Sequence, residues 1–315
     1  MVLRLPHSHA FSTSQAEDAG ISAKALARLV AEGAVERLSR GWYIRIDARA
    51  TEHANAINRM AQHTTPLVAA HHTAAAIHGL RVPQADSRQF FVCDPARRRP
   101  DYLPGIVLLP ATIGRRDVIR LDGLRVTTLE RTALDLARGC SLEYALVPID
   151  HAYALGASKG KLIAARRRMH GWPGTRVLDR ALAVADARAE SALESMSRGA
   201  IIAAGLPHPV LQREVRGRSG RRWRADFVWE GARVIGESDG FGKYSERGQF
   251  ELEKFRDSDL RAAGWTVVHW TFEQMLLGDR PALRWLEQAL GVRASADPGW
   301  LHSSRPPSRR RVAGA

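Results

Sequence analysis

The chain has 315 residues, and its 45% hydrophobic content can build packed cores in about two domains, which excludes a disordered or fibrous protein. Its 47 Lys and Arg residues exceed its 33 Asp and Glu residues, so the net charge is +14 with His neutral. Such an excess of positive charge favours a polyanionic partner, either nucleic acid or an anionic membrane surface.

The start of the chain, MVLRLPHSHAF, has no apolar core of signal-peptide length, and the longest uncharged stretch, 61–80, carries four His and three Thr. Cys93 and Cys140 are 47 residues apart and lack the close pairing of zinc and redox motifs. We therefore expect a cytoplasmic protein with reduced cysteines and no membrane segment. The Pro- and Arg-rich residues 293–315 predict a basic, disordered tail.

Residues 1–50 carry the pattern of two short helices followed by a hairpin. Ser14 to Ala19 is a helical turn, Gly20 breaks it, and Ser22 can cap a second helix that runs to Glu32. Residues 35–38 and 42–45 have the composition of two strands joined by a short turn. This order predicts a winged helix-turn-helix, which places a helix in the major groove of DNA with a hairpin beside it.

Basic side chains gather on the second helix and the hairpin of this module, and we expect them to contact DNA phosphates: Lys24, Arg28, Arg37 and Arg40. The alternative is a helical cap whose charges are only solvated. The stretch GISAKALARLVAEGAVERLSRGWYI resembles the winged-helix start of the abortive-infection type IV antitoxins (AbiEi-like). That resemblance implies DNA as a partner and makes a cognate toxin a possible second partner. It does not indicate the oligomeric state.

Residues 51–174 are predicted to form a small α/β domain. Helical and strand signals alternate through this part, at 71–80 (helix), 89–93 and 106–109 (strands), 117–126 (a hairpin turned at Asp122-Gly123), 129–138 (a helix opened by a capping box of Thr127 and Glu130) and 141–153 (a helix capped by Ser141). The segments HHTAAAIHGL and VTTLERTALDLA resemble the body of the AbiEi-like antitoxins. With the winged helix, the resemblance covers about half the chain.

Residues 175–292 carry the most informative pattern. After a helical linker, the sequence predicts a helix, three strands, a helix and a strand, at 188–205, 210–215, 221–229, 233–239, 249–262 and 265–270.

A two-residue turn at Glu230-Gly231 places Asp226 opposite Ile235, with Glu237 as its diagonal neighbour. Because side chains alternate along a strand, Asp226, Glu237 and Asp239 are then expected on one face, within about 7–8 Å of each other along the diagonal. Three converging carboxylates favour Mg²⁺ or Mn²⁺.

The order of these elements resembles the PD-(D/E)XK nuclease fold. The segment RADFVWEGARVIGESDGFGKY, followed by EKFRDSDLRAAGWTVVHW, is similar to the sequences of nuclease domains related to the very-short-patch-repair endonuclease. This similarity extends over residues 188–290. The resemblance assigns roles to these residues: Asp226 and Glu237 hold the metal, Glu194 is an extra acid with Glu190 as its substitute, and Arg256 and Arg261 neutralise the scissile phosphate.

One position departs from this nuclease pattern. Asp239 stands where the nucleases have a Lys that orients or deprotonates the attacking water, and Lys243 is the nearest candidate to replace it. An ionised carboxylate only accepts hydrogen bonds, so this departure puts cleavage in doubt.

We therefore predict an α/β (α+β) chain with a winged helix, a small α/β middle domain and a nuclease-like domain, acting as a DNA-binding, magnesium-dependent endonuclease. The alternative is a transcriptional regulator or type IV antitoxin-like protein whose nuclease-like domain is inactive, its acids only capping turns or lining a binding scaffold. Residues 236–240 also match the G-x-S-x-G pattern of serine hydrolases, with Asp257 and His269 downstream. That class is set aside, because residues 241–268 have no room for the parallel strands it needs.

Overall fold

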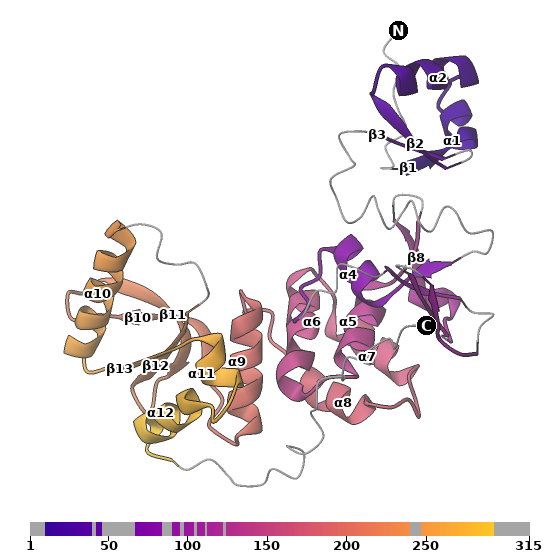
Figure 1. The fold of residues 1–315 in the computed structure, drawn as a ribbon. Coiled ribbons are helices and arrows are strands. Elements are labelled where there is room, and N and C mark those ends of the chain that lie inside the picture. The colour runs from indigo at the N-terminus through magenta and orange to yellow at the C-terminus, as the bar shows by residue number, and fades with distance from the viewer. Residues whose placement is uncertain are drawn as a thin grey trace, which may run out of the picture. The chain divides into compact units, whose positions relative to one another are not determined.

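The computed structural model describes residues 10–39, 42–45, 67–83, 90–94, 98–103, 106–110, 112–121, 124–239 and 247–292. The chain is mixed α/β, which confirms the predicted fold class (Figure 1). It divides into two units: unit 1 comprises Met1–Leu136 and Ala157–Arg168, and unit 2 comprises Ala137–Gly156 and Met169–Ala315.

The first module of unit 1 has the predicted two helices and hairpin, plus a short strand that the sequence pattern misses. Its elements are β1 (Ala10–Ser12), α1 (Thr13–Asp18), α2 (Ala23–Ala31), β2 (Val35–Ser39) and β3 (Trp42–Arg45), with the strands in the antiparallel order β1-β3-β2. Ser22 caps α2 as predicted, because its Oγ accepts a hydrogen bond of 3.2 Å from Ala25 N. Phe11, Ile21 and Leu26 lie in the core of the module.

The second part of unit 1 is a six-stranded sheet in the order β6-β7-β5-β4-β9-β8, in which β4/β9 and β5/β7 pair in parallel. Its strands are β4 (Val68–Ala69), β5 (Phe90–Cys93), β6 (Asp101–Leu103), β7 (Ile106–Leu109), β8 (Val118–Leu121) and β9 (Leu124–Thr127). The helices of this part are α4 (His71–His78), the 3-10 helix η2 (Arg115–Asp117), α5 (Leu129–Ala137) and α7 (Lys159–Arg167). Strands β8 and β9 pair antiparallel up to Leu121 and Leu124, and the predicted turn residues Asp122 and Gly123 lie outside the described residues.

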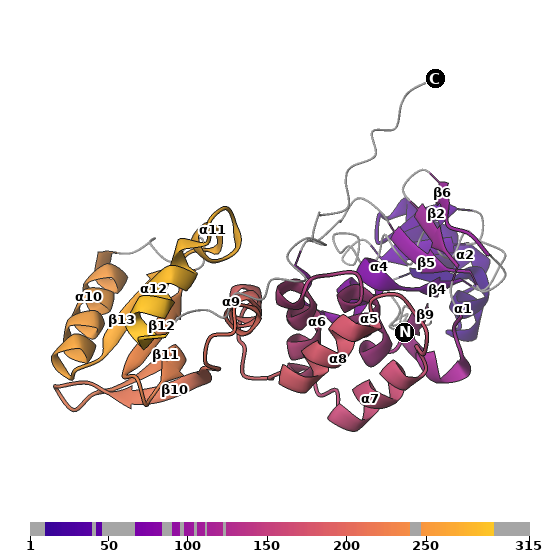
Figure 2. The same cartoon turned by 90° about the horizontal axis from the view of Figure 1, so that it is seen from below.

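Unit 2 contains a four-stranded sheet in the order β10-β11-β12-β13, antiparallel except for the parallel β12/β13 pair. Its strands are β10 (Val210–Arg216), β11 (Arg222–Trp229), β12 (Val234–Ser238) and β13 (Thr266–Trp270). Its helices are α6 (Leu142–Ala154), α8 (Thr175–Val184), α9 (Ala192–Ala203), α10 (Arg247–Ala262), α11 (Phe272–Leu276) and α12 (Pro281–Leu290). The sheet lies between α10 on one side and α9, α11 and α12 on the other (Figures 1 and 2).

The core on the α9 side forms around a close approach of strands β12 and β13. A Cβ built on Gly236 would lie 2.3 Å from the Trp270 ring, so only glycine fits there. Trp270 is fully buried, and its Nε1 donates a hydrogen bond of 2.9 Å to Ser197 Oγ on α9. The last two strands are therefore packed directly onto the helix that carries Glu194.

The turn between β11 and β12 is longer than predicted. Residues 230–233 form it, so Trp229 pairs with Val234 and Val228 with Ile235. The prediction that Asp226 lies opposite Ile235 is wrong by two residues, and the observed register, continued, places Asp226 opposite Glu237. The reason lies at Arg233, whose φ is 54° and whose guanidinium lies 4.5 Å from the centre of the Trp265 ring, which holds this residue in the turn.

The two units do not follow the predicted domain at 51–174, since α6 packs with α9 in unit 2. The boundaries at 50, 174 and 292 stay predictions, and the tail at 293–315 lies outside the described residues. Within the described part of the chain, no helix has the length and apolar character needed to cross a membrane.

Candidate functional site

Helix α2 presents the basic surface expected of a DNA-reading helix. Lys24 and Arg28 lie one turn apart and are exposed, whereas Leu26 is buried under them. Arg28 forms an ion pair of 3.4 Å with Glu32, but both side chains are more than half exposed, so the pair contributes little and a phosphate can replace the carboxylate. Arg37 is exposed on β2, and Arg40 lies outside the described residues.

The two antitoxin-like segments of unit 1 meet at the end of β9. His78 Nε2 lies 2.7 Å from the carbonyl oxygen of Thr127, which only accepts hydrogen bonds, so this nitrogen carries the proton. The hydroxyls of Thr127 and Thr132 lie 2.7 Å apart in the core. The predicted capping role of Thr127 is wrong: Thr128 Oγ1 accepts from Arg131 N, because the side chain of Thr127 is turned into the core.

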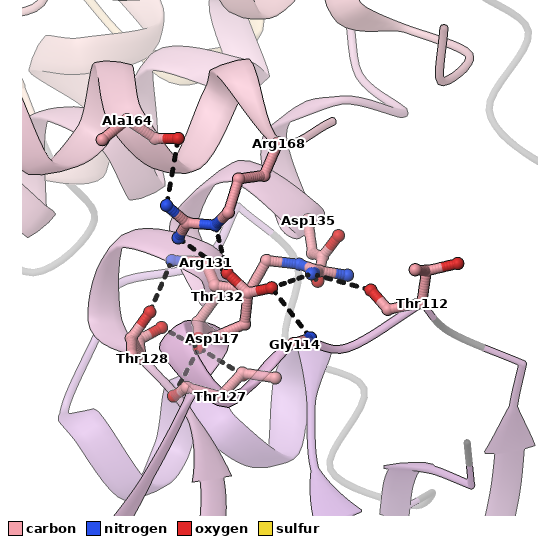
Figure 3. A network of polar contacts seen from close by, with 10 residues as sticks. All are labelled: Thr112, Gly114, Asp117, Thr127, Thr128, Arg131, Thr132, Asp135, Ala164 and Arg168. Carbon is pink, nitrogen blue, oxygen red and sulfur yellow. Dashed lines mark hydrogen bonds and ion pairs between the residues drawn. The ribbon is translucent and has the colours of Figure 1, made fainter. Parts of the chain in front are cut away.

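A buried ionic network continues from this point (Figure 3). Asp117, which is 3% exposed, accepts hydrogen bonds from Arg131 Nη1 at 3.3 Å and from Arg168 Nε and Nη2 at 2.9 and 2.7 Å. Arg131 Nε also donates to Asp135 at 2.7 Å. The polar residues of VTTLERTALDLA therefore fasten η2, α5 and the end of α7 together. This is a structural role, and no local sequence pattern indicates Asp117 and Arg168 as partners.

In unit 2, the structure brings together two of the predicted acids, Glu194 and Asp226. The Gln212 amide nitrogen donates to Glu194 Oε2 at 2.9 Å and to Asp226 Oδ1 at 3.2 Å. Burial raises the pKa of Glu194 and the Asp226 charge raises it further, while a hydrogen bond from the Glu190 backbone amide partly offsets this. Glu190 itself is exposed and pairs with Arg224 at 2.7 Å.

Asp226 is turned away from the other two acids of the predicted cluster. Its Oδ2 accepts hydrogen bonds of 3.0 Å from both the amide and the hydroxyl of Ser238. Strand alternation places the Ser238 side chain on the opposite side of β12 from Glu237 and Asp239. The expectation that all three carboxylates share one face is therefore wrong for Asp226.

The reason is a break in side-chain alternation at this point of the sheet. Ala225 and Val228 both pack on the α10 side, although they are three residues apart, and Phe227 packs on the α9 side. On the neighbouring strand, Gln212 has a φ of 52° and lies opposite Asp226 in the register. The regular alternation assumed from the sequence does not hold where two opposed residues both depart from it.

Glu237 and Asp239 each have a cationic partner. Arg256 of α10 donates to Glu237 Oε1 and to the carbonyl oxygen of Arg224. His269 Nδ1 lies 3.2 Å from Asp239, and its Nε2 lies 3.0 Å from Asp257. Hydrogen bonds to these two carboxylates raise the pKa of His269 to about 10, so the ring is a cation at neutral pH.

The remaining predicted residues of unit 2 are less informative. Arg261 is exposed and pairs with Asp257 at 3.0 Å, and Lys243 lies outside the described residues. Within the described ranges, no group of three or more His, Cys, Asp or Glu side chains is arranged to hold a metal ion. Both nitrogens of His269 bind carboxylates and the Ser238 hydroxyl binds Asp226, so these residues do not form a Ser-His pair.

Sequence reasoning missed Gln212, Ser238 and His269, the residues that contact the acids directly. A pairing argument could have found Gln212, since the turn at 217–220 sets it opposite Asp226. The position of Ser238 near Asp226 follows from the β11–β12 pairing, and the position of His269 near Asp239 follows from the β12–β13 register.

Comparison with known proteins agrees with the winged-helix part. Residues 4–46 match the family described as transcriptional regulator, AbiEi antitoxin. The crystal structure of the RV2827C protein from Mycobacterium tuberculosis covers 66% of this chain and 83% of its own, at 16% identity and a TM-score of 0.32, which is too low to support an argument.

Two uncharacterized proteins of Mycobacterium tuberculosis are more similar in sequence: MT2308 of strain CDC 1551 and Rv2248 of strain H37Rv. Each is 31% identical over 198 residues, which is 62% of this chain and 71% of the relative. The chain therefore belongs to one family with MT2308 and Rv2248, and its residues 4–46 are similar to the AbiEi antitoxin family of transcriptional regulators.

Proposed function

We propose that this protein is a DNA-binding transcriptional regulator of the AbiEi antitoxin kind, which holds duplex DNA through the winged helix of unit 1. The observation that carries this proposal is the exposed pair of Lys24 and Arg28 on α2, within the module that matches the antitoxin family. A helix of this kind lies in the major groove while basic side chains contact the backbone. The proposal includes a cognate toxin as a second partner, without assigning a contact surface for it.

Neutralising the α2 surface tests this function. The double variant Lys24→Gln/Arg28→Gln is expected to lower the slope of log K against log salt by about 1.8, near 0.9 for each lost phosphate contact. The matched control is Lys159→Gln/Lys161→Gln on α7, which removes the same charge from exposed positions of unit 1. Equal slopes for the α2 variant and the parent protein would remove α2 from the DNA surface.

A metal-dependent nuclease is the second candidate function. It is supported by the order α9, β10, β11, β12, α10, β13, with Glu194, Asp226 and Glu237 on three of these elements. The residues as placed do not fit Mg²⁺ or Mn²⁺, because Arg256 holds Glu237, and Gln212 and Ser238 hold both oxygens of Asp226. For this reason we rank the nuclease function below the regulator function.

Plasmid cleavage separates the two candidates. We expect the parent protein to leave plasmid DNA uncut with Mg²⁺ or Mn²⁺, because the acids are already bonded to protein groups. Cleavage that requires the metal and is lost in Asp226→Asn would place the nuclease first. Cleavage that persists in Asp226→Asn indicates a contaminating nuclease.

A further inference from the structure

The β10–β11 hairpin of unit 2 carries a concentration of positive charge that neither candidate function uses. Between residues 213 and 224 the chain has six Arg and one Glu. All six side chains are exposed: Arg213, Arg216, Arg218, Arg221, Arg222 and Arg224. Excess charge of one sign on a short ribbon repels itself unless anions balance it.

In the part of the chain that the structure describes, carboxylates of unit 2 form ion pairs with half of these arginines. Arg213 pairs with Glu230 at 2.9 Å, Arg222 with Glu214 at 3.2 Å and Arg224 with Glu190 at 2.7 Å. Among the described residues, Arg216 and Arg218 have no ion-pair partner, and Arg221 stacks 4.2 Å from the centre of the Trp223 ring. The hydrogen bond from Trp223 lowers the pKa of Asp259 at this turn, and the Arg221 charge adds to that effect, so Asp259 balances part of the Arg221 charge. The charge without an ion-pair partner is therefore that of Arg216 and Arg218, at the closed end of the hairpin.

The strand register places like charges opposite each other at this end. Arg216 pairs with Arg222 across the hairpin, next to the turn at residues 217–220. Like charges directly opposite on an antiparallel pair are destabilising, and their Cβ atoms are about 4.5–5.5 Å apart. An anion bound between these two side chains would relieve the repulsion.

The turn that carries these arginines is held rigidly on α10. Buried Asp259 accepts hydrogen bonds from Ser219 N at 2.7 Å, Ser219 Oγ at 2.9 Å and Trp223 Nε1 at 2.8 Å. A Cβ built on Gly217 would lie 1.9 Å from this carboxylate, so the backbone approaches α10 as closely as glycine allows. Figure 2 shows the end of the hairpin beside α10. Charges on a fixed turn lose less entropy on binding than charges on a mobile one.

We propose that the closed end of the β10–β11 hairpin is a second DNA-binding surface, on which Arg216, Arg218 and Arg221 contact the phosphate backbone of duplex DNA. Duplex DNA carries one charge per about 1.7 Å of its axis, and its major groove admits a two-stranded ribbon. The choice of DNA as the polyanion rests on the function proposed for unit 1, whereas the existence of an anion surface rests on the hairpin alone.

The full-length chain with Arg216→Gln/Arg218→Gln tests the surface. This variant is expected to lower the salt slope for a duplex DNA probe by about 1.8 without lowering the temperature of thermal unfolding, because both side chains are exposed and Arg216 faces the like charge of Arg222. The matched control is Arg188→Gln/Arg284→Gln, which removes the same charge from unit 2 at positions already paired with Asp186 and Asp279. The control is expected to keep the parent slope.

Two further arms identify the polyanion and separate this proposal from the function of unit 1. A hairpin variant that binds the DNA probe with the parent slope overturns the proposal. Loss of binding only to duplex RNA, or only to phosphatidylserine vesicles, also overturns it, since the partner is then not DNA. If the hairpin variant binds DNA more weakly and Lys24→Gln/Arg28→Gln binds DNA as the parent does, the result supports DNA binding by the hairpin. It then contradicts the function proposed for the winged helix.

Discussion

Replacing Asp117 by Ala is expected to lower the free energy of unfolding of unit 1 by about 3–5 kcal/mol, because it removes a charged partner from the buried Arg131. Arg131 is 3% exposed, and its Nη1 lies 3.3 Å from Asp117 (Figure 3). Asp117 also holds the Arg168 guanidinium through two hydrogen bonds, so the end of α7 is released at the same time.

Hydrogen exchange of the β9 and α5 amides measures this loss locally, with the β11 amides of unit 2 as internal reference, since a chain with two units need not unfold in one step. The matched control is Glu32→Ala, which removes a carboxylate from an exposed pair and is expected to cost less than about 1 kcal/mol. If Asp117→Ala does not fold, Asp117→Asn keeps the shape and removes the charge. A cost as small as that of the control would contradict the structural role of the network.

Replacing Arg198 by Met is expected to destabilise unit 2 by about 3–5 kcal/mol at neutral pH. Arg198 Nη2 donates to both oxygens of Asp150, at 2.7 and 2.6 Å, and the two side chains are 5% and 1% exposed. Burial raises the pKa of Asp150, and Arg198 partly opposes that rise. Without Arg198, the buried carboxylate is left with the Asp186 amide as its remaining backbone donor.

The pH dependence of this variant has a definite sign. The pKa of Asp150 rises further when Arg198 is lost, so the folded state binds a proton that the unfolded state does not hold. Stability then increases as the pH falls toward the pKa of the unfolded carboxyl, and part of the loss is recovered in mild acid. Urea unfolding between pH 5 and pH 7.5 checks this, with Arg188→Met as control because its pair with Asp186 is exposed. A loss independent of pH would assign the effect to packing alone.

The sequence predicted those elements whose signals are local. Ser22 as a cap and Gly79 as a helix end each follow from the chemistry of one residue. The short strand β1 was missed because three residues carry no period. Thr127 was misassigned as a cap, since an adjacent threonine offers the same hydroxyl and only tertiary packing decides between the two.

The candidate site in unit 2 was predicted less well, and the cause is long-range geometry. Asp226 and Glu237 were correctly placed on neighbouring strands, and Asp239 lies directly after the second of them, but the orientation of these side chains depends on the four-residue turn and on the break in alternation opposite Gln212. Neither feature has a local signal, because Arg233 and Gln212 are ordinary residues whose positive φ is imposed by contacts made in the folded chain.

Photo-crosslinking tests the central claim, DNA binding through α2, most directly. A benzophenone side chain at Ala27, exposed on α2 between Lys24 and Arg28, is expected to crosslink to a duplex DNA probe at low salt, with a yield that falls as salt rises. The same group at Lys159, exposed on α7, is expected to give little product. Equal yields at the two positions, or none at Ala27 while the protein still binds the probe, would contradict the account.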